Sequence, residues 1–272
     1  MTRSGEVYIC LDQSPNMSKD NMPKRWSKTT TTAFRIIESI DELNDASVTE
    51  LAASLDLAAS TVHNHLGALQ RLGYVVKEDG NYHLSLRFLN VGMSVRNKQT
   101  LTRISQPVVD DLARETGEAA WAATLEDGWV YFICNARGED AIQAYGDLGS
   151  RRRPHAIAAG KSILAQLPDE DVIEIIDETG LTPYTENTVT SRAALFEEFE
   201  SIRERGFAFN RGERLEGGRA VACAILHEGE PIGSIGVSGP AHRFQSERFE
   251  VTLPDAVSGA KNIIELELSS PS

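Results

Sequence analysis

Residues 60–83 read STVHNHLGALQRLGYVVKEDGNYH, and this stretch decides the fold. Its first half has the period of an α-helix over residues 60–72, which Gly73 is placed to end. The apolar positions share one face of that helix: Val62, Leu66 and Leu69. The opposite face is small and polar: Ser60, Asn64, Gly67 and Arg71. Such a face fits the DNA major groove, where Asn pairs with adenine and Arg with guanine or phosphate.

The histidines of this helix have different expected roles. His63 lies on the flank of the polar face, so it is a candidate DNA contact together with Thr61 near the start of the helix. His65 lies at the rim of the apolar face, and we expect it to be structural. An ordinary solvated surface is the alternative for the whole polar face, and the helix alone does not separate the two interpretations.

The second half of the stretch predicts a β-hairpin. β-Prone residues at 74–77 and 81–86 flank a turn that ends in Asp-Gly, and this dipeptide favours tight turns because it adopts positive φ angles. A hairpin directly after a recognition helix is the wing of a winged helix. We expect Lys77 and Asn81, beside its tip, to lie against the adjacent DNA backbone or minor groove. The two acids at the tip argue against deep insertion.

Two amphipathic helices are expected before the recognition helix, over residues 30–43 and 48–55. Ser47 is a suitable N-cap for the second helix, and Glu50 completes a capping box. The predicted apolar face of the first helix consists of Phe34, Ile37, Ile40 and Leu43. That of the second consists of Val48, Leu51, Ala52 and Leu55. A turn of about four residues leads to the recognition helix, as in helix-turn-helix motifs.

The composition is that of a water-soluble globular chain. At 272 residues and 41% hydrophobic content, it can bury enough apolar surface for two domains. It contains no apolar run of about 18 residues, so we expect no membrane span and a cytoplasmic location. The three cysteines, Cys10, Cys134 and Cys223, are too widely spaced for a disulfide framework or a metal cluster. We therefore expect buried, reduced thiols and no bound metal.

The charge is acidic and unevenly distributed. The formal net charge is −13, yet residues 1–90 hold 9 Lys and Arg against 11 Asp and Glu. Residues 91–272 hold 18 against 29. An acidic protein repels nucleic acid overall, so DNA binding needs a local face of basic and polar groups. Lysine is scarcer than arginine, and a cytoplasm of high salt, which screens remote charges, is one explanation.

Four stretches, taken together, resemble the IclR-type transcriptional regulators. The first is the stretch from residue 60, extended to residue 92. The others are AAGKSILAQLP at 158–168, LTPYTENTVTSRAALFEEFESIRERGFAFNRGE at 181–213, and GSIGVSGPAHR at 233–243. They follow the family pattern in order, and the resemblance spans about residues 29–265.

The resemblance implies an α+β protein with three parts. These are an N-terminal winged helix-turn-helix DNA-binding domain (residues 23–85), a linker helix (86–101), and a C-terminal effector-binding domain with an antiparallel sheet and flanking helices (102–268). Residues 1–22 lie outside the resemblance, and we expect them to be a disordered extension. Met1, Met17 and Met22 are all candidate start residues.

The residues of the C-terminal part independently predict α+β structure. Two hairpins are expected, joined at Glu126–Gly128 and at residues 227–230. Their strands are residues 119–125, 129–134, 221–226 and 232–238. Helices are expected over residues 160–167, 169–179, 191–205 and 254–268. The linker is apolar at Leu86, Leu89 and Met93.

In the resembled family, a small molecule, often a carboxylate, lies in a cavity beneath the Gly-Lys helix. By motif position, the resemblance implies these effector-binding residues here: Arg152, Arg153, His155, Ala158, Ala159, Asn210, Gly218, Ala220, Gly236 and Ser238. Three positions depart from the family pattern: Arg153-Pro154-His155 replaces Pro-Leu-His, Ala220 replaces Cys, and Ala224 replaces Pro. These departures leave the effector's identity open.

Arg151–Arg153 is the only run of three basic residues in the chain. A guanidinium can hold a carboxylate through two parallel hydrogen bonds. We therefore expect Arg152 or Arg153 to bind an anionic effector, such as a small organic or sugar acid, with Ser238 and backbone N–H groups as neutral partners. Arg151 is expected on the solvated surface or against neighbouring acids.

Two enzyme-like patterns need an alternative explanation. Gly160-Lys161-Ser162 resembles the end of a phosphate-binding loop, but His155 stands where its first glycine is required. His155 and Ser162 could form part of a hydrolytic triad, but no Gly-x-Ser-x-Gly motif is present. A simpler expectation is a helix that begins at Gly160 and Lys161 and turns its backbone N–H groups toward a bound anion.

The sequence therefore predicts a non-enzymatic, effector-controlled transcription factor that needs no cofactor and binds double-stranded DNA. The alternative is a small-molecule enzyme or sensor whose winged helix contacts a protein. A single winged helix reads only a half-site, so we expect a homodimer, or a dimer of dimers, on a pseudo-palindrome. Repression or activation, and the target genes, stay open.

Overall fold

The structure, a computed structural model, describes residues 27–142 and 147–270. The chain divides into two compact units, with the boundary between Arg96 and Asn97. The predicted N-terminal extension and Cys10 lie outside the described residues.

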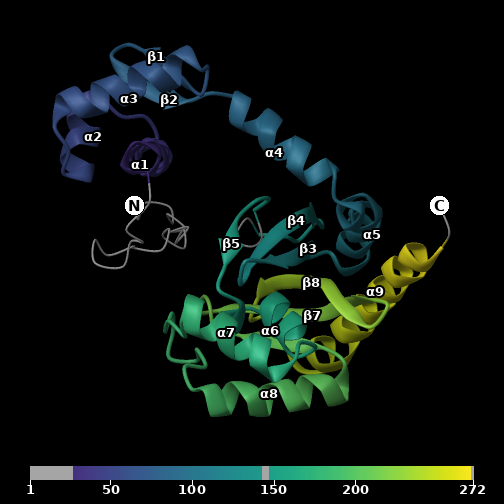
Figure 1. The fold of residues 1–272 in the computed structure, drawn as a ribbon. Helices are drawn as coiled ribbons and strands as arrows, with labels where there is room; N and C mark the ends of the chain where they lie inside the picture. Colours follow the sequence, from purple (N-terminus) through teal and green to yellow (C-terminus); the bar gives the residue numbers. More distant parts are fainter. Residues whose placement is uncertain (1–26, 143–146, 271–272) are drawn as a thin grey trace, which may run out of the picture. The chain divides into compact units, whose positions relative to one another are not determined.

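The N-terminal unit consists of three helices, a hairpin and a fourth helix (Figure 1). These elements are α1 (Lys28–Leu43), α2 (Val48–Leu55), α3 (Ala59–Arg71), β1 (Val75–Glu78), β2 (Asn81–Leu84) and α4 (Arg87–Asn97). The predicted capping box is confirmed, because Ser47 Oγ accepts from the Glu50 N–H and the Glu50 side chain accepts from the Ser47 N–H. Helix, turn, helix and wing therefore follow one another as predicted.

The wing turns on two residues, where a three-residue turn was predicted. Glu78 pairs with Asn81, and Asp79 and Gly80 between them have φ angles of 48° and 92°. Positive φ at both central positions is the geometry that matches the twist of paired strands. The hairpin is also joined to the loop before α2, since Ala46 and Tyr82 exchange backbone hydrogen bonds of 3.1 and 2.8 Å.

The predicted apolar face of α1 is partly wrong. Phe34 is 58% exposed and Leu43 is 45% exposed, whereas Ile36 is fully buried. Ile36 and Ile40 lie one helical turn apart, while Phe34 lies about 200° around the axis from Ile36. The core of this unit consists of Ile36, Ile40, Ala46, Leu51, Val62, Leu66, Leu69, Val75 and Tyr82.

The predicted linker segment, residues 86–101, contains α4 and only the first two residues of the next helix. α4 ends at Asn97, and α5 (Thr100–Thr116) begins the C-terminal unit, with Leu101 already in its core. α5 was not predicted, although Leu101, Ile104, Val108 and Leu112 follow a helical period. Pro107 lies inside this helix. Proline is unfavourable at such a position, because it has no backbone N–H to donate to the preceding turn.

The C-terminal unit is a six-stranded antiparallel sheet between two layers of helices (Figure 1). Its strand order is β5-β4-β3-β8-β7-β6. The strands are β3 (Ala119–Glu126), β4 (Trp129–Arg137), β5 (Arg151–Arg152), β6 (Ala208–Arg211), β7 (Gly218–His227) and β8 (Glu230–Pro240). The other helices are α6 (Ala158–Leu164), α7 (Asp169–Thr179), α8 (Arg192–Arg205) and α9 (Leu253–Ser269).

Each face of the sheet has its own core. α5 and α9 cover one face, where Ala120, Cys134 and Cys223 are buried. α6, α7 and α8 cover the other, which holds Trp121 and Phe132 and is called the inner face below. Cys134 and Cys223 are buried thiols that form no disulfide in the described residues, and burial raises the pKa of Cys223 to about 12.

Both predicted hairpins are present, again with two-residue turns. Glu126 pairs with Trp129, and His227 pairs with Glu230. The edge strands β5 and β6 were not predicted, because they are only two and four residues long. The helix predicted over 160–167 begins and ends earlier, at Ala158 and Leu164.

A buried carboxylate joins β3 to the turn after β8. Glu118 is fully buried, and Arg243 donates to both of its oxygens at 2.9 and 2.6 Å. Arg248 donates to the same carboxylate at 3.1 Å. Paired guanidinium groups offset the cost of burying this charge.

Candidate DNA-binding and effector-binding sites

The recognition helix α3 exposes the face that was predicted to meet DNA. Val62, Leu66 and Leu69 are buried. Among the predicted DNA contacts on α3, Ser60, His63, Asn64 and Arg71 are exposed and Thr61 is half-buried. His65 is half-buried as well. The four exposed residues carry an imidazole, an amide, a hydroxyl and a guanidinium. Each of these groups can donate hydrogen bonds to base edges or phosphates.

The wing presents Lys77 and Asn81 on the two strands beside the turn. Both are exposed. The Lys77 ammonium lies 5.3 Å from the ring centre of Tyr82, its cross-strand partner. Tyr82 is buried in the unit's core, so this contact orients Lys77 at the surface of a firmly attached hairpin.

Four of the predicted effector residues form a patch on the inner face of the sheet. Ala220 pairs with Ser238 across β7 and β8, and Gly236 and Gly218 follow on the same face. Trp121 of β3 pairs with Gly236, where an added Cβ would come within 2.5 Å of the indole. Glycine is therefore needed so that the indole can lie across this strand.

Trp121 was not among the predicted site residues. Its Nε1–H donates to Ser238 Oγ at 3.2 Å, and its ring meets Phe132 edge-on with ring centres 5.3 Å apart. The available signal was a single large aromatic residue within the alanine-rich strand AAWAAT. Because one lone pair of Ser238 is occupied by the indole, its hydroxyl proton can be directed to another group.

His155, Ala158 and Ala159 are all buried in the turn and helix that cover this patch. His155 Nε2 lies 3.0 Å from the carbonyl oxygen of Thr182, and its ring stacks on Tyr184 with centres 6.1 Å apart. Gly160 packs so closely on the turn that an added Cβ would lie 2.2 Å from the Pro154 carbonyl oxygen.

Asn210 of β6 is used structurally. Its Nδ2 donates to the Ala156 carbonyl at 2.6 Å. Its Oδ1 accepts from the N–H groups of Gly212 and Glu213 at 3.1 and 3.2 Å. The amide therefore joins the turn after β6 to the segment that contains His155.

The three consecutive arginines have different surroundings. Arg151 and Arg153 lie over the ring of Trp129, at 4.3 and 5.0 Å from its centre. Arg153 also donates to the Thr179 carbonyl at the end of α7 at 2.7 Å. Arg152 pairs with Val130, which belongs to the inner-face core, so the Arg152 side chain leaves β5 on the inner face.

The expectation of a helix that begins at Gly160 and Lys161 is wrong. α6 begins at Ala158, and the Lys161 N–H donates to the Ile157 carbonyl at 3.0 Å, so that N–H is not directed at an anion. The Ser162 hydroxyl donates to the Ala159 carbonyl and lies 2.8 Å from Ser234 Oγ. Ser162 and His155 thus have different partners, which does not support a hydrolytic triad.

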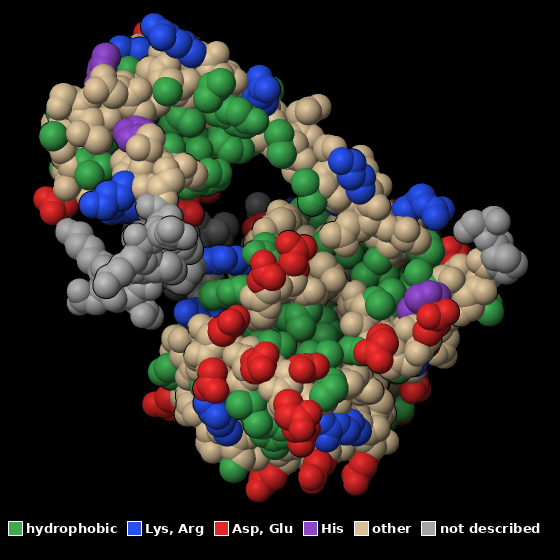
Figure 2. Space-filling model, in the orientation of Figure 1, with side chains coloured by type: hydrophobic (Ala, Val, Ile, Leu, Met, Phe, Trp, Pro, Cys, Tyr) green, Lys and Arg blue, Asp and Glu red, His purple; other side chains and the backbone are tan. Residues whose placement is uncertain are grey.

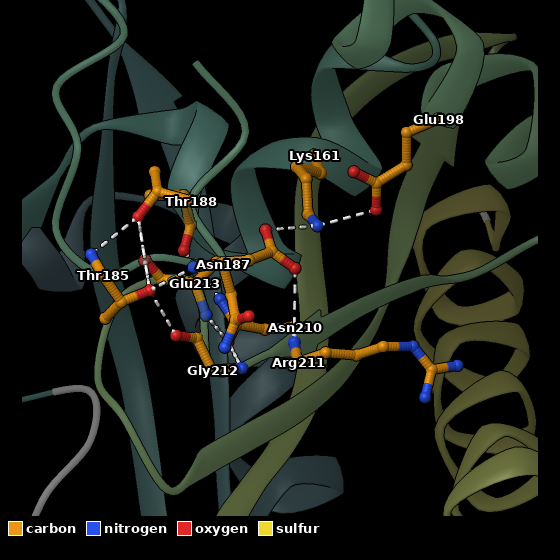
Figure 3. A network of polar contacts seen from close by, with 10 residues as sticks. Lys161, Thr185, Asn187, Thr188, Glu198, Asn210, Arg211, Gly212 and Glu213 are labelled. Carbon is orange, nitrogen blue, oxygen red and sulfur yellow. Dashed lines mark hydrogen bonds and ion pairs between the residues drawn. The ribbon is translucent and has the colours of Figure 1, made fainter. Parts of the chain in front are cut away.

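The Lys161 side chain belongs to a buried charged network (Figure 3). Its side chain is fully buried, and Nζ lies 2.7 Å from Glu198 Oε1 and 2.6 Å from Glu213 Oε2. Burial raises the pKa of Glu213, and the charge of Lys161 partly opposes this shift. This network was not predicted, because its acids follow Lys161 by 37 and 52 residues.

The raised pKa of Glu213 predicts a pH dependence of stability. A carboxyl whose folded-state pKa lies above its unfolded value binds more protons when folded, so stability is lost as pH rises through the folded pKa. Wild type should therefore lose stability relative to Glu213→Gln as pH rises from 4.5 through that raised pKa. Urea unfolding of both proteins across this range measures the difference, and parallel pH profiles would contradict the assignment.

A surface hollow of about 770 Å³ lies elsewhere, between the end of α5 and the segment after β4. Its lining is charged and includes Arg114, Glu115, Glu139 and Asp140. None of the predicted effector residues lines it. Within the described residues, no cluster of His, Cys, Asp or Glu is placed to hold a metal ion, and no helix is long and apolar enough to span a membrane.

Each of the two units matches the model of a known protein domain. The IclR helix-turn-helix domain model matches residues 29–79, and the model of the bacterial transcriptional regulator IclR C-terminal domain matches residues 93–264. The probable HTH-type transcriptional regulator ArcR of Halobacterium salinarum is 31% identical over 261 residues, covering 94% of this chain and 99% of the relative.

Solved structures extend the comparison. The Thermotoga maritima IclR is similar with a TM-score of 0.75 and 28% identity, over 89% of this chain and 99% of that one. An IclR homologue from Microbacterium hydrocarbonoxydans, complexed with 4-hydroxybenzoate, has the same fold, with a TM-score of 0.74 and 20% identity over 88% and 98% of the two chains. This chain belongs to the IclR family of transcriptional regulators.

Proposed function

We propose that this protein is a non-enzymatic regulator that binds an operator as a homodimer in the cytoplasm and is controlled by a small anionic metabolite. The observation that carries the proposal is the exposed polar face of α3 beside a firmly attached wing. α3 enters the major groove with Ser60, Thr61, His63 and Asn64, and Arg71, Lys77 and Asn81 contact phosphates or the adjacent groove.

Two observations on the N-terminal unit support the homodimer. α4, which lies wholly among the described residues, buries none of its side chains. Leu86, Leu89 and Val95 are 83%, 61% and 58% exposed. Figure 2 shows hydrophobic side chains gathered on the visible face of this unit. A second copy would cover these groups and place two recognition helices on two half-sites.

We expect a dimeric mass, or a multiple of it, at micromolar concentration. Leu89→Glu should shift the mass toward that of the single chain and weaken operator binding, because it places a charge in an apolar contact. Ile173→Glu is the matched control, because it makes the same kind of change at an exposed apolar side chain of α7, in the C-terminal unit. Sedimentation equilibrium measures the mass of wild type and of both variants. A monomeric wild type with full operator affinity would contradict the dimer.

The chemistry of the inner face supports an anionic effector. Arg152 leaves β5 on this face, and the Ser238 hydroxyl is oriented by Trp121. Together they offer a guanidinium and a hydroxyl donor for a carboxylate, beside the small residues Ala158, Ala159, Gly218, Ala220 and Gly236. Binding of 4-hydroxybenzoate, a carboxylate, by the Microbacterium homologue is consistent with this class of ligand. Arg153, His155 and Asn210 support the wall of the site.

Arg152→Ala should weaken acid binding by roughly 1.5–3 kcal/mol, about 10- to 150-fold, because it removes a charge-assisted hydrogen bond. Arg151→Ala is the matched control and should bind as wild type does, since Arg151 lies over Trp129. A thermal-shift panel of small organic and sugar acids, with uncharged amides for comparison, identifies a ligand for calorimetry. Stabilisation only by neutral compounds, or equal affinity of both variants, would contradict an anionic effector.

The regulatory proposal is tested on the DNA complex. An acid that binds the protein should change the protein's affinity for a DNA fragment from upstream of its own gene. For this to happen, the acid must bind the DNA-binding arrangement of the dimer and the released arrangement unequally. Footprinting with and without the acid measures this change. Acid binding that leaves the footprint and the affinity unaltered would refute control by that ligand.

A further inference from the structure

Two loops of the C-terminal unit are tied to each other by threonine hydroxyls. Residues 180–190 form no helix or strand, and the second loop follows β6 at residues 212–217. Thr188 Oγ1 donates to the Glu213 carbonyl at 2.6 Å, and Thr185 Oγ1 donates to the Gly212 carbonyl at 2.7 Å (Figure 3). These contacts replace the backbone ladder that a loop lacks.

The same two loops are joined to the turn and helix that carry the candidate effector residues. Tyr184 of the first loop accepts from Arg153 at 3.0 Å and stacks on His155. In the second loop, the N–H groups of Gly212 and Glu213 donate to Asn210, which donates in turn to Ala156. Residues 154–159 are therefore held from both sides.

One ion pair joins the two loops to α6. The Glu213 carboxylate meets Lys161 Nζ at 2.6 Å and accepts from the Arg211 N–H at 3.2 Å. The same ammonium meets Glu198 of α8 at 2.7 Å. An ammonium and a carboxylate that are both buried attract each other strongly, since little water screens them, and each is costly to leave unpaired.

We propose that the two loops, residues 181–190 and 212–217, form a single clamp over residues 154–159, held closed by the Lys161–Glu213 contact. The clamp opens and closes as one unit, because Thr185 and Thr188 transmit any displacement of one loop to the other. Its role in admitting an effector rests on the function proposed above. Its cooperative opening is independent of that function.

Amide hydrogen exchange of the full-length chain tests the clamp without effector or DNA. The double variant Lys161→Met/Glu213→Gln removes one positive and one negative charge, and leaves Glu198, which is 22% exposed and can reach water. Peptides from residues 154–164, 181–190 and 212–217 should exchange at least about tenfold faster than in wild type. Peptides from α5 and α9 should be unchanged.

Arg114→Met/Asp111→Asn is the matched control. It removes the same two kinds of charge from an exposed pair on α5, whose side chains are 74% and 71% exposed. Exchange of both loops should stay as in wild type. If the double variant at Lys161 and Glu213 accelerates exchange across the whole chain equally, or in only one loop, the clamp is refuted.

Thr188→Val provides a second test that leaves every charge in place. It removes the hydroxyl that donates to Glu213 and keeps the shape of the side chain. Faster exchange in both loops is the expected result, and faster exchange confined to residues 181–190 would overturn the clamp. Either negative outcome leaves the proposed DNA and effector binding intact, since neither ligand takes part in the measurement.

Discussion

Asn64→Ala is expected to weaken operator binding by roughly 2–6 kcal/mol, because each good amide–adenine contact contributes about 1–3 kcal/mol and a dimer makes two. This loss corresponds to between about thirty-fold and more than 10⁴-fold in affinity. Asn64 is exposed on α3, one turn after Ser60 and on the side opposite Val62 and Leu66. Non-specific DNA binding should be nearly unchanged, since an amide carries no charge.

Two further variants separate base recognition from phosphate contact. Arg71→Ala should weaken specific and non-specific DNA more evenly, and should reduce the dependence of affinity on salt. Asn262→Ala makes the same change as Asn64→Ala on an exposed position of α9 and should bind as wild type does. Fluorescence anisotropy with operator and random duplexes measures all three. Unchanged operator affinity for Asn64→Ala would contradict the orientation of α3.

Lys161→Met is expected to lower the free energy of unfolding by roughly 3–5 kcal/mol, the usual cost of removing one partner from a buried ion pair. The methionine fills a similar volume, so the loss comes from two carboxylates left without a cation. Glu213 is 6% exposed and cannot reach water without opening its loop. Urea denaturation measures the change.

Lys98→Met is the matched control for this prediction. Lys98 is exposed, so its loss should change stability by less than about 0.5 kcal/mol. Adding Glu213→Gln to Lys161→Met should restore much of the lost stability, since it removes one of the uncompensated charges. If Lys161→Met is as stable as wild type, the buried triad does not hold the two loops in solution.

The sequence predicted the N-terminal unit well because its signals are local. α2 and α3 alternate apolar and polar residues with a helical period, and the wing turns on an Asp-Gly pair. The error in α1 arose because Phe34 is apolar and yet exposed, and periodicity alone did not distinguish its face from that of Ile36. α5 was missed because Pro107 normally ends a helix. Because proline has no N–H, Pro107 leaves the carbonyl of Arg103, four residues earlier, without its helical donor. Arg103 is exposed, so water can bind that carbonyl.

The effector region was less predictable, because its side chains are arranged by contacts between distant segments. Lys161, Glu198 and Glu213 come from two helices and a loop. Trp121 reaches Ser238 from a strand 117 residues away in the sequence. Neither pairing has a local pattern, and β5 is too short to predict. Arg152 was distinguished from its two neighbours only by the register of that strand against Val130.

Selection of genomic DNA fragments by the purified protein, followed by sequencing, shows whether α3 recognises a specific operator. Sheared DNA from the source genome is passed over the full-length protein at moderate salt, with Asn64→Ala in parallel. Wild type should enrich fragments that share a pseudo-palindrome with half-sites about one helical turn apart, and Asn64→Ala should lose this enrichment. Retention of fragments without a shared sequence, or equal enrichment by wild type and Asn64→Ala, would contradict operator recognition through α3.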